Sequence, residues 1–415
     1  YGRVRKQFKL PIGKFEGVEE ALARIAGNTY VLDAARKLTA LAVDLGEKPS
    51  VISAIVKYHC TERGRAVIND AMDVHGGKGI CMGPNNYLAR GYQQTPIGIT
   101  VEGANILTRS MIIFGQGAVR AHPYVLKEIQ AAHDSDTGQA LRNFDAALIG
   151  HVSFSLSNAA RSLVFGVVGG YGIPVPAVGA TQHYYQQLTR YSSAFALAAD
   201  VSMLVLGGSL KRREKISARL GDVLSQLYLC SAVLKRFEDE GRQAEDLPLL
   251  HWAMQDGLYR IQTALDGVLQ NFPSRVAAFL LRTLIFPLGR CQRPPSDELG
   301  HQAASLLLQP GSARDRLTAG IYLPRDENNA VGALEAALES TLACESLYAR
   351  MEEARKAGRL KKLDEVARIL EACDEGVIRV DEARKLERDY ALRRKVIMVD
   401  DFAPEALSQG GRGAQ

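Results

Sequence analysis

The sequence lacks the motifs by which many metal and nucleotide proteins are recognised. No zinc-ligand spacing, P-loop, GxSxG or HExxH motif occurs, so metal chemistry is not predicted and no metal ligand is assigned. The six cysteines form no Cys-x-x-Cys pair and no ligand-like pairing with the eight histidines. They are interpreted as buried, reduced thiols of an intracellular protein: Cys60, Cys81, Cys230, Cys291, Cys344 and Cys373.

Long uncharged apolar runs are also absent. Residues 192–210 come closest to 18 apolar residues in a row, but Asp200 interrupts them, and we interpret them as a buried core helix rather than a membrane span. No signal peptide and no initiator methionine are present, because the chain begins at Tyr1 in the basic run YGRVRKQF. That beginning is typical of the middle of a domain, so we expect a C-terminal piece of a longer protein.

The charge balance does not favour nucleic acid as a partner. Lys and Arg number 51 and Asp and Glu 46, which leaves a net charge of +5 spread over 415 residues. Tyr184 and Tyr185 and the Arg-rich stretch 211–213 do not interleave on a shared face. The chain is 47% hydrophobic and 23% charged, as in ordinary globular proteins, and at about 150 residues per domain its length predicts two or three domains.

The hydrophobic periodicity is helical nearly everywhere, so the sequence predicts an all-α protein. Helices are expected from residue 15 to 45 and from 51 to 75, with a break at Gly76–Gly79, a turn at 95–98 and a helical pattern over 100–114. A heptad-like seam over 216–237 predicts an antiparallel helix pair within one chain, in preference to a coiled coil between two chains, and residues 258–268 form another seam. The predicted division is a four-helix-type bundle domain over 1–120, a linker over 121–140, a second helical region over 141–400 and a disordered tail over 401–415.

The segment 272–290 is basic and amphipathic. Val276, Phe279, Leu280, Leu284 and Phe286 are large and apolar, three arginines flank them, and the segment itself contains no acidic residue. Such a segment can lie in a membrane interface, and a core helix with arginine on its outer face is equally compatible. Both interpretations remain open at this point.

Two further segments invite a functional interpretation. The glycine turn at 76–83 is not a Rossmann fingerprint, because a helix precedes it and Pro84 follows; its bare backbone lets another helix or a phosphate-bearing cofactor approach. Glu102 is the one acidic residue in TVEGANIL, residues 100–107. A solvated or capping glutamate and a general base in apolar surroundings are both compatible with that pattern.

Four segments together resemble the C-terminal helical domain of the acyl-CoA dehydrogenases. They are RKQF at 5–8, HGGKG at 75–79 after a long helix, LARGYQ at 88–93 and VEGANIL at 101–107. Their order and spacing agree with the family over about residues 1–120. The remainder, including ISARLGDVLSQLYL at 216–229, resembles the long C-terminal extension of the bacterial fatty-acid-oxidation members.

The resemblance implies a reaction and a set of site residues. The family uses FAD to convert an acyl-CoA into a trans-2-enoyl-CoA, the first step of fatty-acid β-oxidation. Glu102 falls on the family's catalytic base and Gly103 on a position beside the substrate thioester. Arg5, Phe8, Gly76 and Gly77 fall on positions that contact the flavin cofactor. The resemblance further implies an electron-transfer flavoprotein or an equivalent acceptor, a homo-oligomer, and a bacterial cytoplasmic protein, with peripheral contact to the inner membrane through 272–290.

The sequence departs from the family at several of these segments. Lys9 stands where glycine is usual, Asp73 where many members have glutamine, and Ala104 where threonine is usual. The chain would lack the family's first helical domain and β-barrel, so we expect no turnover from it alone. Two alternatives remain: an acyl-CoA oxidase, which shares the flavin chemistry, and a helical interaction or membrane-docking module without chemistry.

Overall fold

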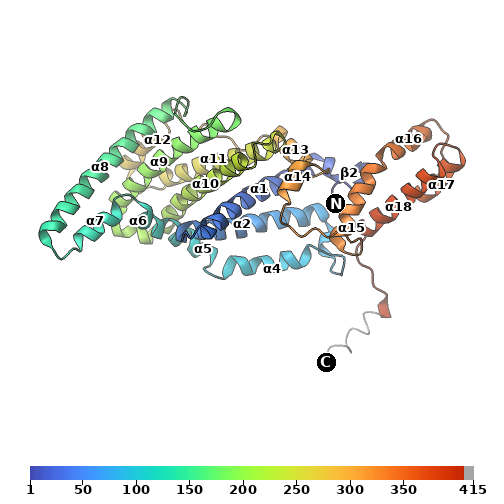
Figure 1. Cartoon of the computed structure of the whole chain (residues 1–415), viewed down its shortest axis with the longest axis horizontal. Coiled ribbons are helices and arrows are strands. Elements are labelled where there is room, and N and C mark those ends of the chain that lie inside the picture. The colour runs from blue at the N-terminus through green and yellow to red at the C-terminus, as the bar shows by residue number, and fades with distance from the viewer. Residues whose placement is uncertain (406–415) are drawn as a thin grey trace. The chain divides into compact units, whose positions relative to one another are not determined.

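The chain folds into helices joined by short connections (Figure 1), and this computed structural model describes residues 1–405, apart from the side chains of residues 119 and 120. The all-α class predicted from the periodicity is confirmed. The longest helices in the first 240 residues are α1 (Glu16–Asp44), α2 (Ser50–His75), α8 (Thr137–Val167), α9 (Gln182–Leu206) and α10 (Glu214–Asp239). The strands β1 (Lys6–Gln7) and β2 (Leu10–Pro11) form one short antiparallel hairpin.

The chain forms two compact units built from interleaved segments. The first unit contains Tyr1–Ala26, Arg65–Thr95 and the chain from Gly300 onward; the second contains Gly27–Gly64 and Pro96–Leu299. Helices α1, α2 and α4 (Ala89–Thr100) therefore each contribute one end to each unit. These units divide the chain differently from the sequence-based domains, whose boundaries at 120 and 140 remain a prediction.

The second unit is centred on the antiparallel pair of α10 and α11 (Leu247–Gln270), which lie side by side (Figure 1). A side chain at Gly257 would collide with Cys230, and one at Gly267 would collide with Arg219, so positions pair in opposite chain directions. The predicted seams form this contact, and Leu220, Leu234 and Ile261 are fully buried in it. The pairing expected at the sequence level is confirmed.

The remaining helices of the second unit complete its layers. Helix α8 packs against α9, α7 (Val125–Ala132) and α12 (Arg275–Ile285). The side chains of Asp136 and Ser274 accept hydrogen bonds from backbone N–H groups in the first turns of α8 and α12, which fixes where those helices begin. The short segments are α5 (Asn105–Leu107), the π-helix η2 (Thr108–Gln116) and α6 (Gly117–Ala121).

The first unit gathers the C-terminal helices around a buried polar network. Asp389 on α18 (Val380–Ile397) is fully buried and accepts hydrogen bonds from Thr341, Tyr348 and Arg393. Because a buried carboxylate needs partners, this network stabilises the packing of α15 (Ala330–Ala343) on α18. The other helices here are α3 (Gly77–Ile80), α13 (Asp297–Ser305), which begins just before this unit's last segment, α14 (Ser312–Leu317), α16 (Glu345–Lys356) and α17 (Glu365–Asp374).

The turn expected at residues 95–98 is not formed: these residues continue α4, with Pro96 inside the helix. The hydroxyl of Thr95 donates to the carbonyl of Gly91 in the preceding turn. The stretch 121–140 contains α7, and its role as a linker remains a prediction. Of the predicted tail, residues 401–403 have no regular structure, and residues 406–415 lie outside the described part.

One helix is long and apolar enough to cross a membrane by length and composition, or two if α4 and the helical segment after it count as one broken span. That helix, Gly179–Arg212, has a mean hydropathy of 1.6, and 44% of its apolar window is buried inside the protein. Asp200 lies within it and is bonded to His122 and Ser155. These contacts fit the buried core helix that the sequence predicted. Core helices of soluble proteins can also be long and apolar enough to meet the length and composition criteria for a membrane span.

Candidate functional site

The loop between α4 and α5 carries Glu102 in an unusual backbone conformation. Glu102 has φ = 54° and Gly103 has φ = 93°, so two consecutive residues are left-handed. For a residue with a side chain, this conformation costs about 1 kcal/mol or more. The Glu102 side chain is exposed, and no acceptor is recorded for its backbone N–H within residues 1–405.

A set of hydrogen bonds fixes this loop to α2. The ammonium group of Lys57 donates to the carbonyl of Gly103 at 2.7 Å and to Oδ1 of Asn105 at 2.6 Å. Asn105 is only 2% exposed, and its amide donates to Thr61 at 2.8 Å and to Glu62 at 2.9 Å. The loop is therefore held rigidly beside Glu102, and the Glu102 carboxylate takes no part in these hydrogen bonds.

The described residues form no apolar pocket around Glu102. The neighbours Val101, Ala104 and Ile106 are exposed as well. This chain by itself therefore does not provide the apolar surroundings that one of the two sequence interpretations of Glu102 requires. The reason is structural: the loop lies at the surface, with only Asn105 directed into the interior.

The segment with Arg5 and Phe8 forms a tight hairpin in the first unit. Phe8 and Lys9 connect β1 to β2 with φ values of 49° and 68°, as in a type I′ turn. The usual family glycine at position 9 would adopt this conformation without strain, whereas Lys9 does so at a cost. The turn presents the Phe8 ring to the outside, where it is 88% exposed.

A chain of aromatic contacts links Arg5 to the glycine turn. Arg5 donates to the hydroxyl of Tyr1 at 3.3 Å, and the Tyr1 ring stacks on His75 with ring centroids 4.2 Å apart. His75 immediately precedes Gly76, which has φ = 56°. The structure thus brings together two of the segments assigned to the cofactor.

His75 is a neutral, half-buried connector. Its Nδ1 lies 2.7 Å from the carbonyl of Ala71 and its Nε2 lies 2.6 Å from the hydroxyl of Tyr87, so Nδ1 donates and Nε2 accepts. Burial lowers the pKa of His75 to about 4, although the hydrogen bond to Ala71 opposes this shift, and burial raises the pKa of Tyr87. The sequence offered no signal for this role.

A groove of about 680 Å³ lies beside the glycine turn. Side chains added at Gly76 or Gly77 would meet nothing within 4 Å, so the backbone there is open to an incoming group. Asp73 contributes a carboxylate to the groove wall. Its lining residues come from α2, α4 and the loop between them: Asn69, Met72, Asp73, Gly76, Ile80, Met82, Ala89, Tyr92 and Gln93.

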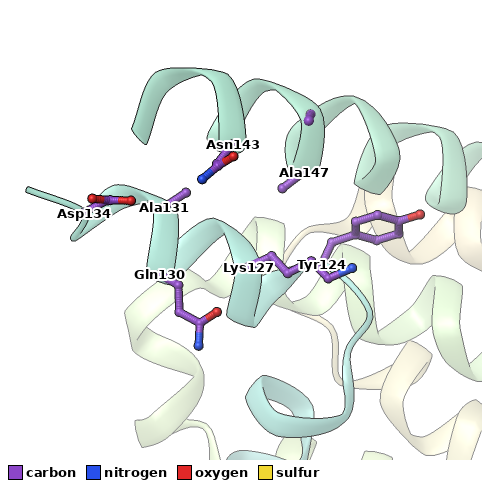
Figure 2. A pocket seen from close by; sticks show the side chains of 8 residues that line it. Tyr124, Lys127, Gln130, Ala131, Asp134, Asn143 and Ala147 are labelled. Atoms are coloured by element: carbon purple, nitrogen blue, oxygen red, sulfur yellow. The ribbon is translucent and has the colours of Figure 1, made fainter. Parts of the chain in front are cut away.

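A second cavity, of about 410 Å³, lies between α7 and α8 (Figure 2). Ala131 on α7 and Ala147 on α8 line it, together with the polar side chains of Lys127, Asp134 and Asn143. None of the sequence-predicted site residues lines this cavity.

A cluster of metal-type ligands that the sequence did not predict lies beside this cavity. Ligand atoms of His122, His151 and Asp200 lie within 4.8 Å of one another. However, Nδ1 of His122 accepts hydrogen bonds from two backbone N–H groups, at 3.1 and 3.2 Å. Its proton therefore resides on Nε2 and is donated to Asp200 at 2.9 Å, so Nε2 offers no free lone pair to a metal in this arrangement.

The rest of the cluster is also satisfied by the protein. Ser155 donates to the second oxygen of Asp200, and His151 bonds Glu128 at 2.8 Å. The cluster ties the start of α7 to α8 and α9. Its residues are 29 to 78 positions apart, too far for a motif search to group them.

These features define a helical protein in which a loop carries the exposed carboxylate of Glu102 and a glycine turn at Gly76 and Gly77 leaves its backbone accessible. Residues 1–115 match the family model described as "Acyl-CoA dehydrogenase, C-terminal domain", and residues 119–402 match "Acyl-CoA dehydrogenase, C-terminal, bacterial type". The chain belongs to the acyl-CoA dehydrogenase family, as the resemblance predicted.

Individual relatives are distant. The chain is 26% identical over 288 residues to "Probable acyl-CoA dehydrogenase FadE10" of Mycobacterium tuberculosis and Mycobacterium bovis, covering 65% of this chain and 42% of theirs. It is 37% identical over 84 residues to a "3-(aryl)acrylate reductase" of Clostridium sporogenes, covering 19% of this chain and 21% of that protein. The chain thus spans less than half the length of these curated relatives.

A solved structure has a similar fold. The acyl-CoA dehydrogenase of Bacillus anthracis, determined in complex with FAD, aligns with a TM-score of 0.55 at 18% identity, covering 74% of this chain and 51% of that one. At this identity the likeness establishes the fold alone.

Proposed function

We propose that this chain supplies the catalytic base of an FAD-dependent acyl-CoA dehydrogenase that converts a fatty acyl-CoA into a trans-2-enoyl-CoA. The observation that carries the proposal is the left-handed backbone of Glu102 on a loop that Lys57 and Asn105 fix to α2. Backbone strain at a residue with a side chain persists only where surrounding contacts enforce it, and such residues cluster at functional sites.

The chemistry requires a base and a donor at one place. A thioester α proton is weakly acidic, so its removal needs a hydrogen bond to the carbonyl oxygen as well as a base. The Glu102 carboxylate takes the α proton, and its backbone N–H, which has no recorded acceptor among residues 1–405, donates to the thioester oxygen. Gly103 leaves space beside the thioester. FAD, when bound, accepts the β hydrogen as a hydride.

The residues assigned to FAD fit parts of that cofactor. The open backbone at Gly76 and Gly77 admits a group at close range, and the exposed Phe8 ring offers a flat apolar contact. Arg5 supplies a cation suited to the pyrophosphate. Asp73 in the groove suits hydroxyl or amino groups rather than phosphate, so we assign the groove to the nucleoside part of the cofactor.

The exposure of Glu102 supports a further part of the proposal. A base works best in a site that excludes water, so the cover over Glu102 is assigned to the acyl-CoA and to parts of the full-length protein outside this chain. The chain by itself is then inactive. A homo-oligomer, an electron-transfer flavoprotein or equivalent acceptor, and a bacterial cytoplasmic location with peripheral contact to the inner membrane belong to the same proposal.

The test replaces Glu102 with glutamine in the full-length protein. Glu102→Gln keeps the side-chain volume but removes the base, so flavin reduction by acyl-CoA, followed anaerobically by bleaching, should slow by about 10²–10⁴-fold. Flavin content and acyl-CoA binding should stay near wild type. Bleaching at the wild-type rate would show that the base is another residue.

The control variant, Arg5→Ala, should show the opposite pattern. It should lose flavin on purification and recover flavin reduction when FAD is added in excess, because Arg5 contributes to binding and not to proton transfer. Two variants that failed in the same way would indicate a folding defect. A purified full-length protein without bound flavin would favour a non-catalytic module.

A second candidate is the reduction of an aryl-substituted acrylate. The match to the 3-(aryl)acrylate reductase favours it, because that segment is 37% identical. Reduction runs the same proton and hydride transfers in reverse. Steady-state rates with saturated acyl-CoA esters and with cinnamoyl-CoA under reducing conditions would separate the two reactions, and oxygen consumption would identify an oxidase.

A further inference from the structure

Arg190 on α9 is a buried arginine without an acidic partner. It is only 3% exposed, and no carboxylate is paired with it among the described residues. Its contacts are the sulfur of Cys291 at 3.3 Å, the amide oxygen of Gln187 at 3.5 Å and the ring of Tyr191. Its Nε atom is buried with no hydrogen-bond partner at all.

This arrangement leaves a positive charge that requires an anion. A buried guanidinium without a counter-charge is strongly destabilising, and proteins normally pair it with a carboxylate. The group closest to serving as that anion is the thiol of Cys291, because a deprotonated sulfur accepts a charge-assisted hydrogen bond. The side chain of Gln292 contributes a second, longer donor to the same sulfur, at 3.7 Å.

The thiol is also accessible from outside. Cys291 follows α12 in an extended connection and is exposed, whereas its cationic partner is buried beneath it. Reactive cysteines combine these two properties: a neighbouring cation that favours the thiolate and a path for an incoming reagent.

Four of the other cysteines lack this combination, and the burial predicted for all six is wrong for Cys81 and Cys291, which are exposed. Cys230 is buried, and burial raises the pKa of its thiol to about 12. Burial likewise raises the pKa of Cys60 and of Cys344. Cys81 is exposed, but no hydrogen bond from a cation to its sulfur is recorded in the described part of the chain. Cys81 is therefore a matched internal control.

We propose that Cys291 is a redox-sensitive thiol, activated by the hydrogen bond from Arg190 and oxidised by hydroperoxides to a sulfenic acid. The sulfur attacks one peroxide oxygen, a sulfur–oxygen bond forms and the oxygen–oxygen bond breaks. Sulfur is oxidised by two electrons, and the peroxide is reduced to hydroxide or alkoxide, which takes up a proton from water. A low-molecular-weight thiol reverses the step through a mixed disulfide. This site is separate from the proposed dehydrogenase chemistry and does not depend on it.

The first experiment compares Cys291 and Cys81 within the wild-type full-length protein. Each is alkylated with iodoacetamide at several pH values and quantified by peptide mass spectrometry. At pH 6.5, Cys291 should react at least about tenfold faster than Cys81. The difference between the two rates should become smaller as the pH rises to 8.5. Equal rates and equal pH profiles would overturn the proposal.

The second experiment assigns the effect to Arg190. Arg190→Met should bring the Cys291 rate down to that of Cys81, whereas Arg190→Lys should retain part of the difference. Hydrogen peroxide followed by dimedone should label Cys291 in wild type and not in Arg190→Met. An unchanged rate in folded Arg190→Met would contradict the proposal, and if that variant does not fold, the wild-type comparison decides the question.

Discussion

Four non-glycine residues adopt a left-handed backbone within the described residues: Phe8, Lys9, Glu102 and Arg242. Arg242 follows the C-terminus of α10, where helices commonly end in this conformation. The other three lie in the two segments whose residue types resemble the family's flavin-contacting and base-bearing motifs. At the residue scale, strain and motif therefore select the same positions by independent routes.

A pH-dependent stability follows from His75. Its pKa is about 4 in the folded state, below the 6.5 of an unperturbed histidine, so between these values the unfolded chain binds a proton that the folded chain does not. Stability therefore falls as pH drops from 6.5 to 4, by up to about 3 kcal/mol from this residue. Urea unfolding at several pH values measures the slope.

The variant His75→Gln provides the control for this slope. Glutamine does not titrate, so its stability should depend less on pH in the same interval. Burial also lowers the pKa of His59, and this second contribution should remain in both proteins. Identical slopes for wild type and His75→Gln would refute the role assigned to His75.

At the element scale, the structure of α12 bears on both interpretations of residues 272–290, as a core helix and as a segment in a membrane interface. Phe286 is buried, as are Leu281 and Ile285, so one face of the segment belongs to the core. Val276, Phe279 and Leu280 lie on the opposite face and are exposed. Arg282 and Arg290 each donate to Asp266 at 2.9 Å, so an acid from α11 offsets two of the charges that the segment shows in sequence.

The exposed face of α12 remains a candidate for contact with an anionic lipid surface. Replacing Val276, Phe279 and Leu280 together with serine should reduce co-sedimentation with anionic vesicles by at least about tenfold, because apolar area no longer enters the interface. Vesicle binding of this variant at the wild-type level would contradict the proposal.

A matched control is available on α1 and directly after it. Leu41, Val43 and Leu45 are also exposed but lie beside Asp44 and Glu47, so their replacement with serine should leave vesicle binding unchanged. Phe286→Ser, by contrast, should destabilise the protein, since Phe286 packs in the core. Circular dichroism at each step distinguishes lost docking from lost folding.

At the scale of the whole molecule, non-contiguous segments are joined by buried polar contacts. In the second unit, Arg63 of α2 donates to Asn28 of α1 at 2.6 Å, to Gln226 of α10 at 3.1 Å and to Asp256 of α11 at 3.1 Å. Four helices thus meet at one guanidinium, and burial lowers the pKa of Arg63. Asp256 supplies the compensating charge.

Removing the negative charge of Asp256 should lower the stability of the protein. Asp256→Asn leaves a buried arginine without an anion and should lower the free energy of unfolding by about 3–5 kcal/mol. The same substitution at Asp239, whose pair with Lys235 is exposed, should cost less than about 1 kcal/mol. Urea denaturation of both variants measures the difference, and equal losses would show that Asp256 does not anchor the unit.

The helical class and the ends of the first two long helices followed from the sequence, because periodicity, caps and glycine breaks are local properties. The turn predicted at residues 95–98 is the most informative of the predictions that were wrong. Its Pro96 and Gly98 are typical of a turn, yet α4 continues through them to Thr100. Gly98 faces Thr61 on α2 so closely that an added Cβ would lie 3.2 Å from it, so tertiary packing overrides the local preference there.

By itself, the sequence determined the all-α class, the α10–α11 pair, the family and the residues that resemble its base and cofactor contacts, because those depend on neighbours along the chain. Only the tertiary structure decided that Lys57 holds the loop at Gly103 and Asn105, that Asp266 faces two arginines, and that Arg190 meets a thiol instead of a carboxylate. Those partners lie 16 to 101 residues apart, and charge compensation depends on distance in space, which no local pattern encodes.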